Sequence, residues 1–168
     1  MKEDFDWLNL DGSENIVWSG EPRIKSIIPA VIVGVPMIAA FGLGVLIIVG
    51  AYLSVKNTDY VVTEESLYVK KGVLSRSVQK IDFDKVQNIS FSQGVLGNHF
   101  GYGNIEISTA GGSGVEMRFR SIENPREVQD RINGLMKKEQ SETMEGEESQ
   151  KEILKDIRSE LQKLNENI

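Results

Sequence analysis

Cysteine is absent from this chain of 168 residues, and histidine occurs once, as His99. The absence of cysteine excludes a disulfide framework, thiolate catalysis and cysteine metal ligands. A lone histidine needs partners at ligand or catalytic spacing to hold a metal or move a proton, and the sequence offers none. We therefore expect no metal and no other cofactor.

A strong positive charge is also missing, because the net charge is −6 at pH 7. Residues 1–25 form an acidic N-terminal arm with three basic and six acidic side chains. Residues 56–138 carry twelve basic and ten acidic side chains, a balance of only +2. Nucleic-acid-binding proteins usually present a clustered basic footprint, so we expect no nucleic-acid partner.

Charge of either sign is absent from residues 26–55, which lie between Lys25 and Lys56. A membrane-spanning helix needs only about 20 predominantly apolar residues. A buried helix of this length without a polar face would be unusual in so small a protein. The stretch therefore predicts a transmembrane segment, which puts the protein at the cell membrane with membrane lipid as a partner.

Two geometries fit this apolar segment. One helix over residues 26–55 would be about 45 Å long, which exceeds a hydrocarbon core of about 30 Å. A helical hairpin with its turn at residues 42–44 places Arg23, Lys25 and Lys56 on the same side. We favour the hairpin, whose two ends and soluble domain would be cytoplasmic by the positive-inside rule. The single span is the alternative. Two small-residue spacings permit close helix packing, namely Ala30 with Gly34 and Ala40 with Gly44.

Apolar and polar residues alternate after Asp59, which marks short antiparallel strands with one buried side. The apolar members of these runs are Leu67 and Val69, Ile81 and Phe83, Ile89 and Phe91, Ile105 and Ile107, and Val115, Met117 and Phe119. Six or seven such strands predict a small barrel or sandwich. Asn124 suits a helix N-cap and Pro125 the first helical position. The predicted fold class is α+β and mainly β, with an antiparallel barrel or sandwich over residues 57–138 and a C-terminal helix that caps it.

Several short motifs occur here in the order in which one known family has them. They are Gly-Glu-Pro at 20–22, Tyr-Val-Val-Thr at 60–63, Gln-Gly-Val-Leu-Gly at 93–97, Gly-Tyr-Gly at 101–103 and Asn-Pro at 124–125. Over residues 14–138 the chain resembles the bacterial pleckstrin-homology (PH) membrane-protein family. The resemblance implies a short leader, a hydrophobic anchor that is usually two helices, and a PH-like domain. It implies no agreed activity.

Four basic residues lie on or beside the first hairpin of the predicted barrel, namely Lys70, Lys71, Arg76 and Lys80. The resemblance makes them candidate lipid contacts, because eukaryotic PH domains bind phosphoinositides with basic residues of an early hairpin. A basic residue near an anionic membrane surface gains about 1 kcal/mol. Acidic neighbours such as Asp82 dilute this charge, so a solvated strand face is the alternative.

Residues 93–99 form a predicted loop in which Val95 and Leu96 stand among glycines. Two exposed apolar side chains in a loop are typical of a contact with a membrane or a partner protein. The alternative is that they fold back onto the barrel.

The C-terminal tail divides into a linker and a helix. Residues 139–149 are polar and acidic without periodicity, which predicts a linker. Residues 150–168 carry apolar residues at alternating spacings of three and four, typical of a coiled-coil seam. The seam comprises Leu154, Ile157, Leu161, Leu164 and Ile168. Because helices of about 12–15 residues are marginal alone, we expect this amphipathic helix to bind a second copy of the chain or another protein. Docking on its own barrel, or fraying, is the alternative.

Together these features predict a protein without catalytic activity, because the sequence contains no nucleophile–base pair, metal cluster or cofactor loop. We interpret it as a membrane-anchored PH-like interaction module that serves as a scaffold or adaptor in a membrane complex. The alternative is a lipid-headgroup-binding module that acts through the four basic residues of the early hairpin.

Overall fold

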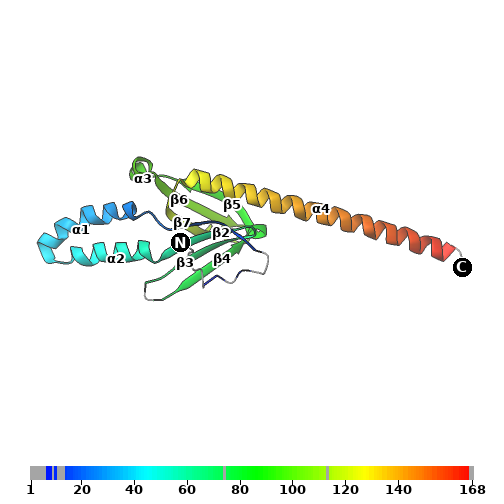
Figure 1. Cartoon of the computed structure of the whole chain (residues 1–168), viewed down its shortest axis with the longest axis horizontal. Helices are drawn as coiled ribbons and strands as arrows, with labels where there is room; N and C mark the ends of the chain where they lie inside the picture. Colours follow the sequence, from blue (N-terminus) through cyan, green and yellow to red (C-terminus); the bar gives the residue numbers. More distant parts are fainter. Residues whose placement is uncertain (1–6, 9, 11–13, 74, 113, 167–168) are drawn as a thin grey trace.

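The computed structural model describes residues 7–8, 10, 14–73, 75–112 and 114–166. Two antiparallel sheets form a β-sandwich at the centre of the molecule. A helical hairpin projects from one end of the sandwich and a long C-terminal helix projects beyond the other (Figure 1). We call these the hairpin end and the tail end. The α+β class predicted from the sequence is confirmed.

The first sheet contains a strand from the acidic leader. Its strand order is β1-β2-β3-β4, formed by β1 (Ile16–Gly20), β2 (Thr58–Thr63), β3 (Ser66–Lys71) and β4 (Ser77–Asp82). β1 precedes the apolar segment and yet pairs with β2, which follows it, so that Gly20 lies opposite Tyr60. This corrects the predicted arm over residues 1–25, because residues 16–20 satisfy the backbone groups along one edge of β2 and belong to the domain.

The second sheet has the order β5-β6-β7 and consists of β5 (Val86–Ser92), β6 (Tyr102–Thr109) and β7 (Val115–Glu123). The 3-10 helix η2 (Phe83–Lys85) links the two sheets, and the short helix α3 (Val95–Phe100) joins β5 to β6. Most of the alternating apolar residues face the core as predicted, with Ile105, Ile107 and Phe119 fully buried. Phe91 and Val115 are exposed instead, and each lies at or next to an end of its strand.

The apolar segment forms a 3-10 turn and two helices, η1 (Ile24–Ile27), α1 (Ile28–Phe41) and α2 (Gly44–Lys56). Gly42 ends α1 with a φ of 66°, a left-handed conformation that glycine adopts without a steric penalty. This break rules out the alternative of one continuous helix. Among the described residues, no helix is both long and apolar enough to cross a membrane.

The C-terminal helix α4 (Pro125–Glu166) begins at the hairpin end and packs along β5 and β6. Val128 and Ile132 are buried in the core, whereas the helix beyond Lys138 extends past the tail end (Figure 1). The predicted linker at residues 139–149 is therefore corrected, because these residues lie within α4. Glu, Gln and Lys are good helix formers, and local contacts such as the Lys138–Glu142 ion pair, at 3.7 Å, support the helix.

Candidate functional site

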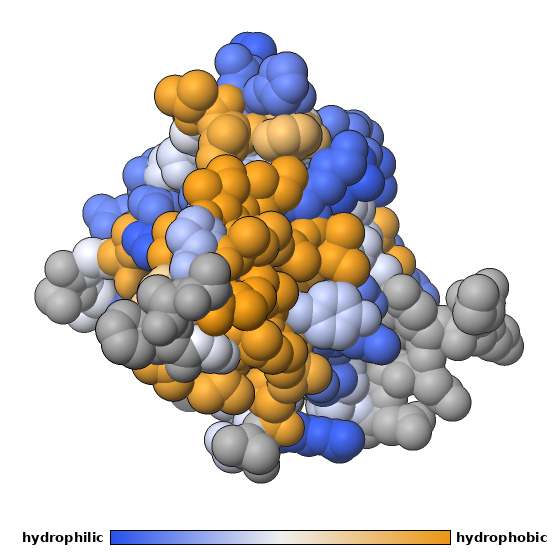
Figure 2. All heavy atoms as spheres, turned by 90° about the vertical axis from the view of Figure 1, so that its left-hand side faces the viewer, coloured by the Kyte–Doolittle hydropathy of each residue, from blue (hydrophilic) through white to orange (hydrophobic). Residues whose placement is uncertain are grey.

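The hairpin end presents a large apolar surface. Figure 2 views the molecule from this end and shows apolar residues gathered over the hairpin. The exposed apolar side chains of α1, α2 and their turn are Ile32, Val33, Val35, Ile38, Leu43, Val45, Leu46, Ile47 and Val49. Leu46 is 70% exposed. A helix that is apolar all round is normally buried in a protein core or a membrane, whereas these side chains face outward.

The two helices of the hairpin pack closely through glycine. A Cβ atom added at Gly44 would lie 1.8 Å from the carbonyl oxygen of Gly34. One at Gly34 would lie 2.7 Å from the side chain of Ile48. Each of these two glycines belongs to one of the small-residue spacings predicted from the sequence. Together they allow α1 and α2 to pack closely within one chain.

Cationic and aromatic side chains surround the base of the hairpin. The Lys56 ammonium lies 5.9 Å from the centre of the Tyr52 ring at the end of α2. The Lys25 ammonium lies 6.0 Å from the centre of the Phe100 ring, which connects the start of the hairpin to α3. In each pair the cation is attracted to the face of the aromatic ring, and Tyr is one of the two aromatic residue types enriched at membrane–water interfaces.

The predicted contact loop at residues 93–99 is largely the helix α3, on the hairpin side of the sandwich (Figure 1). Val95 is 89% exposed, and Leu96 is also exposed. Val95 therefore does not fold back onto the sandwich as the alternative required, whereas Leu96, at 39% exposed, is partly covered. They add a second apolar contact point beside the hairpin.

A cavity of about 240 Å³ lies between the base of the hairpin and the sandwich. Lys71 at the end of β3 and Arg120 on β7 line it, together with the hydroxyl-bearing residues Ser26, Ser54, Thr58 and Ser121. No carboxylate is among the described residues that line it. Burial lowers the pKa of Lys71, and the nearby charges of Arg120 and Arg118 lower it further. We call this cavity the hairpin-base cleft.

The four predicted lipid contacts separate in the structure. Lys70 pairs with Asp59 at 2.7 Å, and Lys80 pairs with Asp82 at 3.3 Å. Lys71 enters the hairpin-base cleft from the neighbouring position on β3, because successive strand residues point to opposite faces. Arg76 is exposed in the connection between β3 and β4. The four residues therefore do not form one basic patch.

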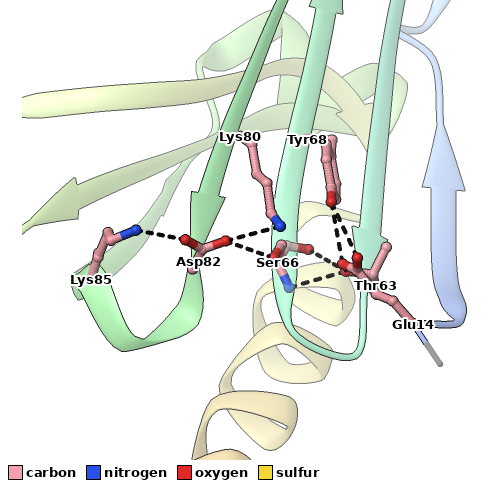
Figure 3. Close-up of polar contacts among 7 residues, drawn as sticks. All are labelled: Glu14, Thr63, Ser66, Tyr68, Lys80, Asp82 and Lys85. Atoms are coloured by element: carbon pink, nitrogen blue, oxygen red, sulfur yellow. Dashed lines mark hydrogen bonds and ion pairs between the residues drawn. The ribbon is translucent and has the colours of Figure 1, made fainter. Parts of the chain in front are cut away.

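A polar network occupies the opposite end of the first sheet, and Figure 3 shows its members Glu14, Thr63, Ser66, Tyr68, Lys80, Asp82 and Lys85. Glu14 is 6% exposed and accepts hydrogen bonds from the hydroxyls of Thr63 and Tyr68. The Ser66 hydroxyl donates to Asp82 at 3.0 Å and is buried. The bonds of Glu14 attach the leader to β2 and β3. Because the hydroxyls of this network are buried, a substrate in solution cannot reach them.

The tail end is acidic where α4 leaves the sandwich. Glu64 and Glu65 of the β2–β3 turn face Glu139 and Glu142 of α4 around a shared hollow. Burial raises the pKa of Glu139, and the neighbouring carboxylates, Asp84 first among them, raise it further. Lys138 also lines this hollow, so carboxylates outnumber cations among the described residues around it.

The predicted seam lies on the part of α4 that projects from the sandwich. Leu154 is 65% exposed and Ile157 is 51% exposed, so neither docks on the barrel. Leu161 and Leu164 lie in the last turns of α4, and Ile168 lies outside the described residues. The alternative in which the tail folds onto its own sandwich is excluded for the two exposed residues.

Sequence reasoning missed Arg120 and Ser121, which line the hairpin-base cleft together with Lys71, and it missed Glu14 as a buried residue. Arg118 and Arg120 alternate with the buried Met117 and Phe119, so their outward position on β7 could be predicted. Their proximity to Lys71 depends on how the two sheets meet. In the described part of the chain, no group of three or more His, Cys, Asp or Glu side chains is arranged to hold a metal ion.

Comparison with models of known families gives a match. The family model described as bacterial PH domain matches residues 22–136, which include the whole hairpin, the sandwich from β2 onward and the packed part of α4. The strand β1 lies outside the matched range. No curated protein and no solved structure matches the chain.

Proposed function

Because the chain belongs to the bacterial PH domain family, we propose that it is a non-catalytic interaction module that docks on a membrane through α1 and α2. PH domains are generally interaction modules rather than catalysts. In this proposal the hairpin is buried in lipid, and the sandwich and α4 remain in water. One observation carries the proposal, namely the exposed apolar side chains over α1, α2 and their turn.

The path of the chain supports a hairpin that enters and leaves the membrane by one face. β1 and β2 are neighbours in one sheet, so the segment between them must return to the place where it began. At about 1.5 Å per residue, α1 and α2 are each about 20 Å long, shorter than a hydrocarbon core of about 30 Å. A hairpin seated mainly in the near leaflet meets both conditions.

The charges at the two ends of the hairpin support a cytoplasmic domain. Arg23 and Lys25 precede the hairpin and Lys56 ends it, so all three lie on the side of the sandwich. Basic residues beside membrane segments are retained on the cytoplasmic side. We therefore propose that the domain lies at the cytoplasmic face of the cell membrane.

Flotation with lipid vesicles tests the docking proposal. Leu46→Glu puts a charge on the most exposed leucine of α2, and we expect the variant to stay in the aqueous fraction while the wild type floats. The matched control is Val78→Glu, on β4, where the side chain is also exposed (48%) but lies on the sandwich. Flotation of Leu46→Glu equal to that of the control would overturn the proposal.

A second role, as an adaptor arm, is supported by α4. The helix carries the exposed side chains of Leu154 and Ile157 on a segment that contacts no other described part of the chain. We propose that this segment pairs with a second helix, from another copy or another membrane protein. Crosslinking in cells, followed by affinity capture, compares the full chain with a chain that ends at Lys138. Loss of a crosslinked product on truncation supports the role, and identical products from the two chains contradict it.

A further inference from the structure

The hairpin-base cleft has the chemistry of an anion site. Lys71 and Arg120 both line it, and in the described part of the chain neither is paired with a carboxylate. The arginines of another hollow, near Trp18, are by contrast paired with carboxylates. Arg23 pairs with Glu123, and Arg131 pairs with Glu127 at 3.7 Å. Two close cations without a counter-ion repel each other, and an anion between them would remove that repulsion.

Hydroxyl groups complete the lining of the cleft. Ser26 belongs to η1, Ser54 to the last turn of α2, and Ser121 to β7. Within the described structure their hydroxyls donate no hydrogen bond to protein. Serine hydroxyls and Lys or Arg side chains are common ligands of phosphate oxygens, and the guanidinium group can bind two oxygens at once.

The position of the cleft favours the phosphate of a lipid headgroup over a free phosphate ester. Ser26 and Ser54 mark the two ends of the apolar hairpin, so the cleft lies at the level where the hairpin would leave the hydrocarbon. A phosphate group at that depth is the headgroup of a phospholipid. Tyr52, an aromatic residue type enriched at membrane–water interfaces, belongs to the same end of α2 as Ser54, and its ring lies 5.9 Å from the Lys56 ammonium.

We propose that the hairpin-base cleft binds the phosphate of an anionic phospholipid between Lys71 and Arg120. This inference rests on the proposed membrane docking and adds the class of ligand to it. It also replaces the basic patch predicted from the sequence, because Lys70 and Lys80 are already paired with Asp59 and Asp82.

The test measures insertion and lipid preference separately in the full-length protein. The variant Leu46→Cys carries a dye whose emission rises in hydrocarbon, and the labelling is specific because the natural chain contains no cysteine. Protein is diluted from detergent into vesicles of phosphatidylcholine alone or of phosphatidylcholine with phosphatidylglycerol. The dye reports insertion into either vesicle, and the ratio of the two apparent affinities reports the preference for anionic lipid.

We expect the wild type to insert into both vesicles and to prefer the anionic ones. Lys71→Gln with Arg120→Gln should still insert into neutral vesicles but should lose the preference, by about five-fold for each charge removed. The matched control is Lys70→Gln with Lys80→Gln, which changes the net charge equally and should keep most of the preference. Lys71→Arg should keep it as well.

Two results would overturn the inference. One is an equal loss of preference in the control pair, which would indicate a general charge effect. The other is a result in which soluble glycerol 3-phosphate protects Lys71 from a lysine-modifying reagent while the protein shows no preference among vesicles. That result would indicate that the ligand of the cleft is a free phosphate ester. Failure of the dye to respond in any vesicle would instead contradict the docking proposal itself.

Discussion

Gly20 and Tyr60 lie opposite each other on β1 and β2, although the whole apolar segment separates them in the chain. The hairpin is therefore an insertion within a sheet of the domain. Its start is held by a hydrogen bond from the Arg23 N–H to the Ser121 carbonyl, at 2.7 Å, and its end continues directly into β2. Both ends of the hairpin are thus attached to the sandwich, which fixes the hairpin-base cleft between them.

The first prediction concerns the leader. Removal of residues 1–20 should abolish cooperative unfolding of the sandwich, because β2 loses its neighbour and Phe119 loses the Trp18 ring that stacks on it at 6.2 Å. Removal of residues 139–168 should leave the unfolding midpoint nearly unchanged, since this part of α4 extends beyond the core. Denaturant titration followed by far-ultraviolet circular dichroism measures both, because removal of residues 1–20 also removes both tryptophans. A stable sandwich without β1 would show that the leader is a separate arm after all.

The second prediction concerns the buried carboxylate of the leader. Glu14→Gln should lower the free energy of unfolding by about 1–3 kcal/mol, because a neutral amide is a poorer acceptor for the hydroxyls of Thr63 and Tyr68. Urea titration provides the measurement. Glu148→Gln, an exposed substitution on α4, is the matched control and should change the free energy little. Equal effects of the two substitutions would show that the hydrogen bonds of Glu14 do not contribute to the free energy of unfolding.

The third prediction uses two glycines of the same helix. Gly44→Ala should separate α1 from α2 and destabilise their contact by about 1–3 kcal/mol, because the new methyl group meets the Gly34 carbonyl. Gly50→Ala places the same methyl group where no atom lies within 4 Å, and it should be neutral or mildly stabilising. Thermal unfolding in detergent, followed by circular dichroism, compares them. Identical melting of the two variants would contradict the close packing.

The fourth prediction concerns acid stability. A hydrogen bond from Lys85, together with bonds from Ser66 and Lys80, lowers the pKa of Asp82 from 3.8 to about 2. A depressed pKa in the folded state means that the ionised carboxylate contributes stability above about pH 4 and that this contribution disappears as the pH falls toward about 2. Asp82→Asn should therefore lose less stability than the wild type across this interval, as measured by urea titration at each pH.

Lys85→Gln provides the complementary variant, because it removes the largest cause of the shift. The pKa of Asp82 in this variant should rise toward its ordinary value, which a carboxyl-carbon NMR titration can follow. A wild-type midpoint near 3.8 would contradict the network drawn in Figure 3.

Local patterns in the sequence were sufficient for much of the fold. The alternation around Leu67 and Ile105 placed strands and their buried faces, and Pro125 marked the start of α4. Gly42 marked the turn of the hairpin, because a left-handed backbone conformation favours glycine. These features depend on neighbours in the chain, which a sequence displays directly.

Features that depend on distant neighbours were not predictable in the same way. The alternation of β1 is too short to separate from an acidic arm, and its role appears only through pairing with β2. Lys71 and Lys70 are adjacent in sequence, yet one enters the hairpin-base cleft and the other pairs with Asp59. The acidic composition of residues 139–149 suggested a linker, although its Glu and Gln residues also favour a helix once α4 has begun at Pro125.

The most direct test of the account is the depth of the hairpin in a lipid bilayer. A fluorophore on Leu46→Cys, in the full chain reconstituted into vesicles, is exposed to quenchers on the lipid acyl chains and to iodide in the water. We predict quenching by the acyl-chain probe and protection from iodide, with the reverse pattern for the same fluorophore on Val78→Cys. Quenching of both positions by iodide would show that the hairpin remains in water and would contradict membrane docking.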